Sequence, residues 1–339
     1  MIGASGVLTS PEVAEALSAN HPVVGLETAV LTHGLPRSPR TSPASLASDQ
    51  EAGSLLGGRE WNSSIPFNLE SVRAIAHAVR VAGAVPATIG VLDGILKIGL
   101  DDHDLERLAM DTTARKVSTR DLAILAANGG SGGTTVAASM RACRLASPRP
   151  IEVFATGGIG GVHRGWQSRP DISADLRALA SEQVVVVASG AKVILDVTAT
   201  LEALDTLGVP VLGFETDRMP LFTAGLHPEL MVPHRFETVE LVARSIRMHW
   251  SEFGIQSGVL VANPCPGDAT TDDKQLDALV DTGLAEASSL GIEGADVTPF
   301  LLASMIDAKG ADPLSSNLAL LVSNAALASR IAIELASGN

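Results

Sequence analysis

The stretch VVVVAS, residues 184–189, is an apolar run that ends in a serine. Three other stretches have the same texture: IEVFATGG (151–158), VPVLGF (209–214) and GVLVANP (258–264). Strands that are apolar along their whole length are typical of a parallel sheet covered on both faces, because a strand with one solvated face alternates apolar and polar residues. These runs therefore predict a largely parallel sheet between two layers of helices.

Helical patterns between and after these runs support the same architecture. They cover SADLRALAS (173–181), ILDVTATLEALDTLG (194–208) and DKQLDALVDTGLAEASSLG (273–291), and the C-terminal part is helical through SSNLALLVSNAALASRIAIELA (315–336). In ATIGVLDGILKIGL (87–100), Asp93-Gly94 joins two apolar runs, which indicates a hairpin with a type I′ turn. The prediction is a three-layer α/β/α domain with a mixed, largely parallel sheet, one hairpin and a helical C-terminal part.

One segment breaks this pattern. Residues 37–66 are rich in Ser, Pro, Gly and charge and show neither helical nor strand periodicity. We interpret them as a flexible surface insertion in a single domain that spans residues 1–339.

Composition limits the classes of function. The 339 residues are 46% hydrophobic and carry a formal net charge of −14, which argues against a nucleic-acid partner. A small anionic substrate would need a locally basic pocket. Cys143 and Cys265 have no metal-like spacing and are expected to be free thiols. The start of the chain has no signal-peptide pattern, and no apolar run is long enough to cross a membrane, so we expect a soluble cytoplasmic protein.

The glycine-rich stretch FATGGIGGVHRG (154–165) is the first candidate for a binding loop. It lacks the dinucleotide fingerprint, because His163 stands at the sixth position from Gly158, and the chain contains no Gly-Lys pair for an ATP-binding loop. Exposed amides beside His163 and Arg164 suit a compact phosphate. A tight turn with a solvated histidine and arginine is the alternative.

Four acidic or basic residues are candidates for chemistry. Lys192 follows an apolar strand and could be a partly desolvated nucleophile, and Glu27 within PVVGLETAV could hold a proton as a general acid. Asp171 and Asp175, with Ser173 between them, could hold a divalent cation. Each has a structural alternative: Lys192 could simply reach solvent, and Glu27 could be a salt-bridged or capping residue at a strand end. Asp171, Ser173 and Asp175 could cap the start of a helix.

Taken in order, these segments resemble the pseudouridine-5′-phosphate glycosidase family, which also contains the indigoidine synthase A-like proteins. The resemblance covers the chain outside residues 37–66. It rests on GLETAVLTHGLP (25–36), VPATIGVLDGILKIGL (85–100), KVSTRDL (116–122), GGTTVAASM (132–140), VFATGGIGGVHRG (153–165), DISADL (171–176), SGAKVILD (189–196), LGVPVLGF (207–214), VANPCP (261–266), TPFLLA (298–303) and LSSNLALLVSNAALAS (314–329).

The resemblance implies reversible cleavage of the C–C glycosidic bond of pseudouridine 5′-phosphate to uracil and ribose 5-phosphate. It implies that Lys192 forms an imine with the ring-opened sugar, that Glu27 delivers a proton to uracil, and that Asp171 binds Mn²⁺. It further implies a homo-oligomer, commonly a trimer. The residues expected to contact substrate are Lys116, Val136, Ser173, Ala174, Asp175 and Asn317, and we place His163 near the sugar phosphate.

Several positions depart from the family pattern. Residues 37–66 follow Pro36 where the family continues almost directly into a helix, Thr119 stands where it tends to have arginine, and Pro170 precedes Asp171. Three other functions stay open: a C-nucleoside synthase that acts on another base, a class I aldolase-like lyase that uses Lys192 alone, and a non-catalytic sugar-phosphate binding protein.

Overall fold

The computed structural model describes residues 6–41, 58–168, 170–192, 194–266, 278, 281–283, 285–287, 289–292, 300 and 313–338. Within these residues, eleven strands form one sheet in the order β1-β4-β3-β2-β7-β8-β13-β9-β12, with β6 on β3 and β5 on β6. The strands are β1 (Val7–Thr9), β2 (Val23–Leu26), β3 (Val85–Leu92), β4 (Ile95–Ile98), β5 (Arg115–Val117), β6 (Gly132–Thr134), β7 (Val153–Ala155), β8 (Val185–Ala188), β9 (Val211–Phe214), β12 (His234–Phe236) and β13 (Val259–Ala262).

The predicted hairpin is confirmed. Strands β3 and β4 are antiparallel with Leu92 opposite Ile95, and the two turn residues Asp93 and Gly94 have φ of 51° and 78°, as a type I′ turn requires. Strand β6 also runs antiparallel to β3, whereas the neighbours from β3 through β2, β7, β8, β13 and β9 to β12 are parallel. Strands β10 (Arg218–Pro220) and β11 (Leu226–Met231) form a separate antiparallel pair.

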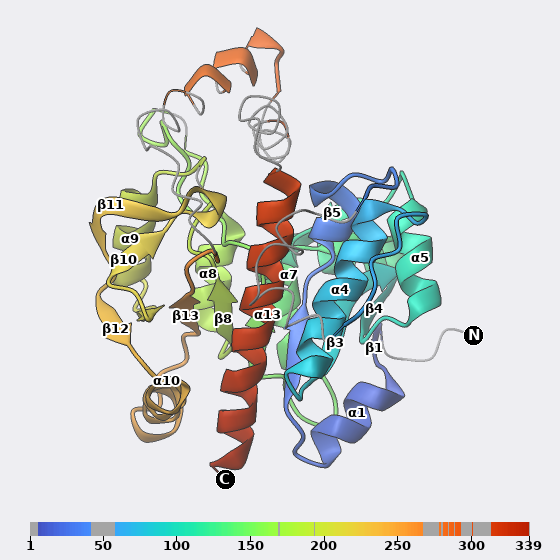
Figure 1. Cartoon of the computed structure of the whole chain (residues 1–339), viewed down its shortest axis with the longest axis horizontal. Helices are drawn as coiled ribbons and strands as arrows, with labels where there is room; N and C mark the ends of the chain where they lie inside the picture. The colour runs from blue at the N-terminus through green and yellow to red at the C-terminus, as the bar shows by residue number, and fades with distance from the viewer. Residues whose placement is uncertain are drawn as a thin grey trace.

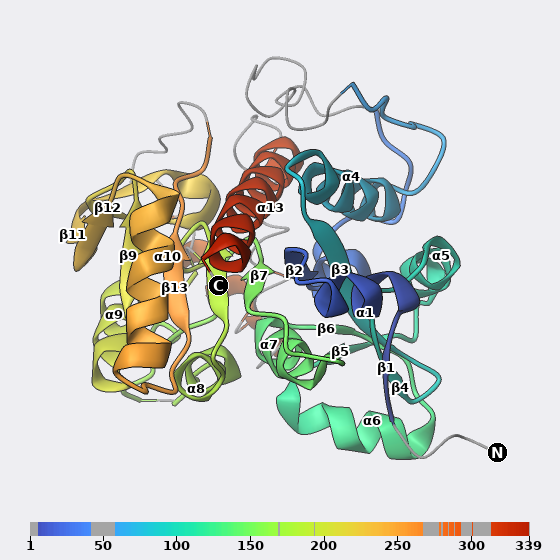
Figure 2. The same ribbon diagram turned by 90° about the horizontal axis from the view of Figure 1, so that it is seen from below.

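Helices cover both faces of the sheet, as the apolar runs predict (Figures 1 and 2). In β8, Val186 and Ala188 pack into the core on one face and Val185 and Val187 into the core on the other, which explains why the strand has no polar position. The first face carries α1 (Pro11–Ser18), α7 (Val136–Leu145), α8 (Ala174–Ser181) and α9 (Val197–Thr206); the second carries α4 (Phe67–Val81), α10 (Val239–Arg247) and α13 (Pro313–Ser337).

Short helical elements complete the architecture. Helix α5 (Asp102–Met110) packs with α4 at the edge of the sheet, and α6 (Leu122–Asn128) lies next to the hairpin. Single turns occur at η1 (Val30–Gly34), η2 (Thr119–Asp121), η3 (Phe222–Ala224) and η4 (Met248–Glu252).

Helix α13 is long and apolar and runs across the middle of the molecule (Figure 1). Its segment Leu314–Ser337 has the length and composition of a membrane span, so the expectation that no run approaches that length is wrong. However, 78% of the most apolar window is buried inside the protein, and the helix packs on α4, α10 and strands β2, β7 and β8. Its apolar character is explained by this central position in the core.

Two predicted segments fall largely outside the described residues. Only parts of the helical pattern at 273–291 are described, and residues 42–57 of the predicted insertion are not. At the described ends of the insertion, Arg37 donates hydrogen bonds to the carbonyls of Thr32 and Asp111, and Arg59 forms a two-pronged ion pair with the buried Glu70. Both flanks are therefore tied to the body of the protein.

Candidate active site

The candidate site lies at the carboxyl ends of the central parallel strands. The chain leaves β2 through η1 and α4, which lie on the face that carries α13, and leaves β7 through a glycine-rich loop and α8, which lie on the other face. Because neighbouring strands β2 and β7 send their connections to opposite faces, a crevice opens between them. The residues that follow these two strands form its inner wall.

Glu27 comes directly after β2 and not within it. The strand ends at Leu26 because the Thr28 hydroxyl donates to the Ile89 carbonyl at 2.6 Å and the chain then turns into η1. Burial raises the pKa of the Glu27 carboxyl above its ordinary value, while the positive charge of Lys192 and a short hydrogen bond from Thr156 oppose that rise. A carboxyl in this environment can hold a proton nearer to neutral pH than an exposed glutamate.

Lys192 lies beyond the end of β8 and lines the same crevice as Glu27. Its backbone N–H donates to the Ile159 carbonyl at 3.2 Å, and Ala191 pairs with Ile159 in a parallel bridge. The glycine-rich loop therefore fixes the backbone of Lys192. Glu27 and Lys192 line the same two cavities, and the positive charge of Lys192 opposes the rise in the pKa of the Glu27 carboxyl.

The crevice has two compartments that share the wall formed by Glu27, Ala29, Lys116 and Lys192. The larger, which we call the polar compartment, has a volume of about 870 Å³. The smaller, the apolar compartment, has a volume of about 260 Å³. All ten predicted site residues line one or both: Glu27, Lys116, Val136, His163, Asp171, Ser173, Ala174, Asp175 and Lys192 line the polar compartment, and Asn317 lines the apolar one.

Two helix N-termini face the polar compartment. Helix α7 begins at Val136 and α8 at Ala174, and the Ser173 hydroxyl caps α8 by accepting from the Asp175 N–H at 3.2 Å. The side chain of Asp175 accepts from the backbone N–H groups of Ala137 at 3.0 Å and Gly160 at 2.8 Å. Ser173 and Asp175 therefore hold the two helices and the glycine loop together, as the capping alternative predicts. Because Asp175 is used in this way, Asp171 is the better placed of the two carboxylates to hold a cation.

Close packing accounts for two of the loop glycines. A Cβ at Gly160 would lie 2.3 Å from the Ser173 hydroxyl oxygen, and one at Gly161 would lie 2.3 Å from that of Thr200. Larger residues would therefore push the loop away from α8 and α9. The loop is therefore a close-packed floor for the compartment.

His163 and Asp171 stand side by side on this floor. The His163 Nδ1 atom lies 3.9 Å from an Asp171 carboxylate oxygen, and the His163 N–H donates to the Asp171 carbonyl at 3.0 Å. Burial and the charges of Lys192 and Lys116 hold the pKa of His163 below its ordinary value, although Asp171 acts in the other direction. A neutral imidazole beside a half-exposed carboxylate is a donor set that suits a divalent cation such as Mn²⁺, with water completing its shell.

The apolar compartment is built from segments far apart in the chain. Val30, Leu35, Phe222, Leu314 and Leu321 form its walls. His33 and Asn317 supply polar groups. Phe222 is in the left-handed region at φ 56°, an uncommon conformation for a bulky residue, and its N–H donates to the Ser189 carbonyl at 2.8 Å. This geometry holds the Phe222 ring against Gly157 and Gly158.

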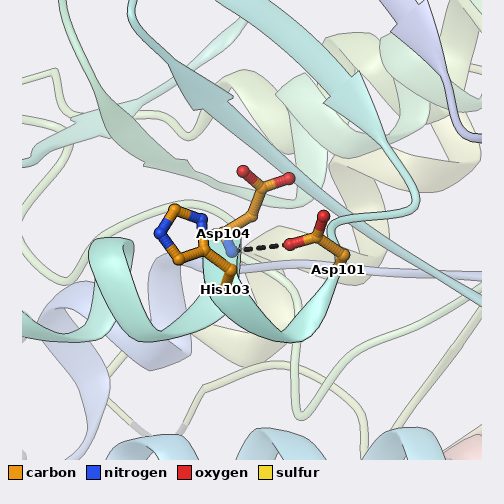
Figure 3. A group of neighbouring side chains, drawn as sticks. All are labelled: Asp101, His103 and Asp104. Atoms are coloured by element: carbon orange, nitrogen blue, oxygen red, sulfur yellow. Dashed lines mark hydrogen bonds between the residues drawn. The ribbon is translucent and has the colours of Figure 1, made fainter.

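A second group of possible metal ligands lies outside this crevice. Asp101, His103 and Asp104 bring ligand atoms within 4.8 Å of one another at the start of α5 (Figure 3). The Asp101 side chain caps the helix by accepting from the Asp104 N–H at 2.8 Å, and Lys97 donates to both Asp104 oxygens at 2.7 and 2.9 Å. Helix capping and an ion pair account for this group.

Comparison with known proteins assigns the family. Residues 62–334 match the family described as indigoidine synthase A like protein. The chain belongs to this family. It is 41% identical over 324 residues to the pseudouridine-5′-phosphate glycosidase of Hahella chejuensis, covering 95% of this chain and 96% of the relative. It is 43% identical over 327 residues to the protein of the same name from Sorangium cellulosum. That comparison covers 96% of this chain and 92% of the relative.

The chain is also similar to a solved structure whose name gives a different activity. The prealnumycin C-glycosynthase AlnA, solved in complex with ribulose 5-phosphate, is 34% identical with a TM-score of 0.79. The comparison covers 98% of this chain and 97% of that one. The resemblance drawn from the sequence and the three-layer fold are both confirmed.

Some residues of the site were missed by sequence reasoning. Thr156 follows β7 as Glu27 follows β2, and a polar residue at the carboxyl end of a parallel strand is the signal that could have found it. Arg141 on α7 and Arg177 on α8 also line the polar compartment, but their positions on amphipathic helices carry no comparable signal. Thr119, which departs from the family pattern, lines this compartment beside Arg120.

Proposed function

We propose that this protein cleaves and forms the C–C glycosidic bond between C1′ of ribose 5-phosphate and C5 of uracil. The observation that supports it is the meeting of Glu27 and Lys192 on the wall between a polar and an apolar compartment. A substrate with a charged sugar phosphate at one end and a flat base at the other needs both environments, with its reacting bond between them. Relatives named pseudouridine-5′-phosphate glycosidase match the chain over nearly its full length.

In this proposal the neutral Lys192 amine attacks C1′, and the ring oxygen leaves as a hydroxyl that takes the proton lost by the amine, so that the sugar opens. Glu27 then protonates C5 of the base while the nitrogen lone pair forms an iminium at C1′, so that the C–C bond breaks and uracil departs. Water hydrolyses the imine and releases ribose 5-phosphate. Thus one water is consumed for each bond cleaved, and Glu27 recovers its proton from solvent.

The other predicted residues have supporting roles in the polar compartment. Lys116 and the N-terminal amides of α7 and α8, at Val136 and Ala174, would hold the phosphate, and Ser173 and Asp175 would keep those helices in place. Asp171, with His163 beside it, would hold Mn²⁺. When bound, the cation would supply positive charge next to the oxygens of the substrate. Asn317 would hydrogen-bond the base in the apolar compartment.

The direct test is release of uracil from pseudouridine 5′-phosphate with Mn²⁺ present, followed by chromatography for the wild type, Lys192→Ala and Glu27→Ala. We expect release by the wild type and loss in both variants. A folded wild-type protein that releases no uracil contradicts the assignment of the base.

Synthesis of another C-glycoside is the second candidate, and it is favoured by the similarity to the C-glycosynthase AlnA. The two activities differ in what the apolar compartment accepts. Incubation of the protein with ribose 5-phosphate and either uracil or a larger aromatic acceptor separates them. Formation of pseudouridine 5′-phosphate supports the first function, and coupling only to the larger acceptor supports the second.

We also propose a cytoplasmic homo-oligomer, with a trimer as the expected state. Light scattering coupled to size-exclusion chromatography measures this directly. A mass of one chain would contradict it.

A further inference from the structure

Four neighbouring strands of the sheet are each followed directly by a polar residue at the same edge. In the order β2-β7-β8-β13, these residues are Glu27, Thr156, Ser189 and Asn263. Three of them are buried, with exposed fractions of 1% for Thr156, 0% for Ser189 and 8% for Asn263. Buried polar groups need hydrogen-bond partners, and one side chain supplies them here.

That side chain is Asn324, which is fully buried in the middle of α13. Its amide nitrogen donates to the Thr156 carbonyl at 2.8 Å and to the Ser189 hydroxyl at 3.1 Å. Its amide oxygen accepts from the Asn263 side chain at 2.9 Å. Both functional ends of the amide are used, so the orientation of Asn324 is fixed by three strand ends.

Thr156 connects this amide to Glu27. Its backbone N–H donates to the Val187 carbonyl at 3.0 Å and its carbonyl accepts from Asn324, so the residue is held on both sides. Its hydroxyl forms the short hydrogen bond to the Glu27 carboxyl. The carboxyl is therefore oriented by a group that α13 holds in place.

We propose that Thr156 and Asn324 are positioning residues for Glu27: the Asn324 amide orients Thr156, and the Thr156 hydroxyl orients the carboxyl toward the wall between the two compartments. This inference rests on the proposed role of Glu27 as proton donor. A hydroxyl that donates to a carboxylate stabilises its ionised form, so the same contact limits how far burial raises the pKa of Glu27.

The test compares Thr156→Val, which keeps the shape and removes the hydroxyl, with Thr156→Ser, which keeps the hydroxyl. The Glu27 carboxyl is titrated by carbon-13 NMR, with its signal assigned by its disappearance in Glu27→Gln. We expect a higher Glu27 pKa in Thr156→Val and a value near the wild type in Thr156→Ser. For uracil release, kcat should fall roughly 10- to 100-fold in Thr156→Val, and the alkaline limb of the pH profile of kcat/KM should move to higher pH.

Asn324→Ala extends the test to the second residue. This variant should raise the pKa of Glu27, as Thr156→Val does. If Asn324→Ala does not fold, Asn263→Ala replaces it: that variant removes one hydrogen bond to the Asn324 amide and should raise the Glu27 pKa by a smaller amount. Lower thermal stability with an unchanged Glu27 titration would show a merely structural role and overturn the proposal. The NMR titration needs no turnover, so it measures the effect of Thr156 and Asn324 on Glu27 even in an inactive protein. A wild type that releases no uracil would therefore contradict the proposed function and leave this proposal to be decided by the titration.

Discussion

The polar and apolar compartments share one wall but are built in different ways. The polar compartment combines charged side chains, such as Lys116, Arg141 and Arg177, with backbone ends: two helix N-termini and a glycine-rich loop, which the carboxylate of Asp175 holds together. The apolar compartment is made of side chains from η1, η3 and α13, including Phe222 and Leu321. Backbone amides suit an anion whose shape is constant, whereas a side-chain surface is readily altered by substitution. In the proposed function, the first compartment takes the sugar phosphate and the second takes the base.

The largest expected effect is at the shared wall. Lys192→Arg keeps the positive charge but removes the amine that forms the imine, so turnover should fall at least about 1000-fold. Borohydride reduction in the presence of ribose 5-phosphate should add the mass of the sugar phosphate to the wild type and not to the variant, as measured by intact mass spectrometry. Substantial uracil release by Lys192→Arg would show that the reaction needs only a positive charge at this position and not an amine.

Glu27→Gln should reduce turnover by about 10²- to 10⁴-fold, the usual range for loss of a general acid. Binding of ribose 5-phosphate should change little, because in the proposed function Glu27 acts on the base and glutamine keeps its size. Calorimetry with ribose 5-phosphate and single-turnover kinetics separate the two effects.

The pH dependence follows from the same carboxyl. Because burial raises the pKa of Glu27, the protonated donor persists to higher pH than an exposed glutamate would allow. Cleavage should be retained below that raised pKa and lost above it, on the alkaline limb of the kcat/KM profile. An alkaline limb that is also present in the residual activity of Glu27→Gln would assign the titration to another group.

A pair of variants tests whether the two compartments act separately. Asn317→Ala should weaken binding of uracil by about tenfold and leave ribose 5-phosphate binding unchanged, whereas Asp171→Asn should weaken Mn²⁺ binding by tenfold or more and leave uracil unchanged. Isothermal titration calorimetry measures all three ligands. A change in Mn²⁺ affinity in Asn317→Ala, or in uracil affinity in Asp171→Asn, would show that the two compartments do not bind their ligands separately.

The smallest expected effect is on stability. Since the pKa of Glu27 is raised in the folded state, its contribution to stability is fully present below the unfolded pKa and lost as pH rises through the folded one. Glu27→Gln should therefore be more stable than the wild type at pH 8, by about 1 kcal/mol, and the gain should shrink at pH 4. Denaturant unfolding at the two pH values measures the difference, and a gain that does not depend on pH would point to packing instead.

Much of the fold could be predicted because its signals are local. The Asp93-Gly94 turn, the Ser10 cap and Pro11 start of α1, and the Ser173 cap of α8 are each specified within a few residues. The stretch PVVGLETAV (22–30) continues beyond the observed end of β2 at Leu26. Thr28, whose hydroxyl and N–H bond to Ile89 and Thr134, stops the strand through contacts that no local pattern reveals.

The apolar strands, the layers of helices, the candidate residues and, through extended motifs, the family can all be predicted from the amino-acid sequence alone. The folded chain was needed to show that the ten candidates line two joined compartments, that Asp175 binds backbone amides, and that Thr156 bonds to Glu27 and Asn324 to Thr156. These contacts join residues that are far apart along the chain. Periodicity reports neighbours one or two turns away, whereas Thr156 lies 129 residues from Glu27 and 168 from Asn324, and only the folded sheet brings them together.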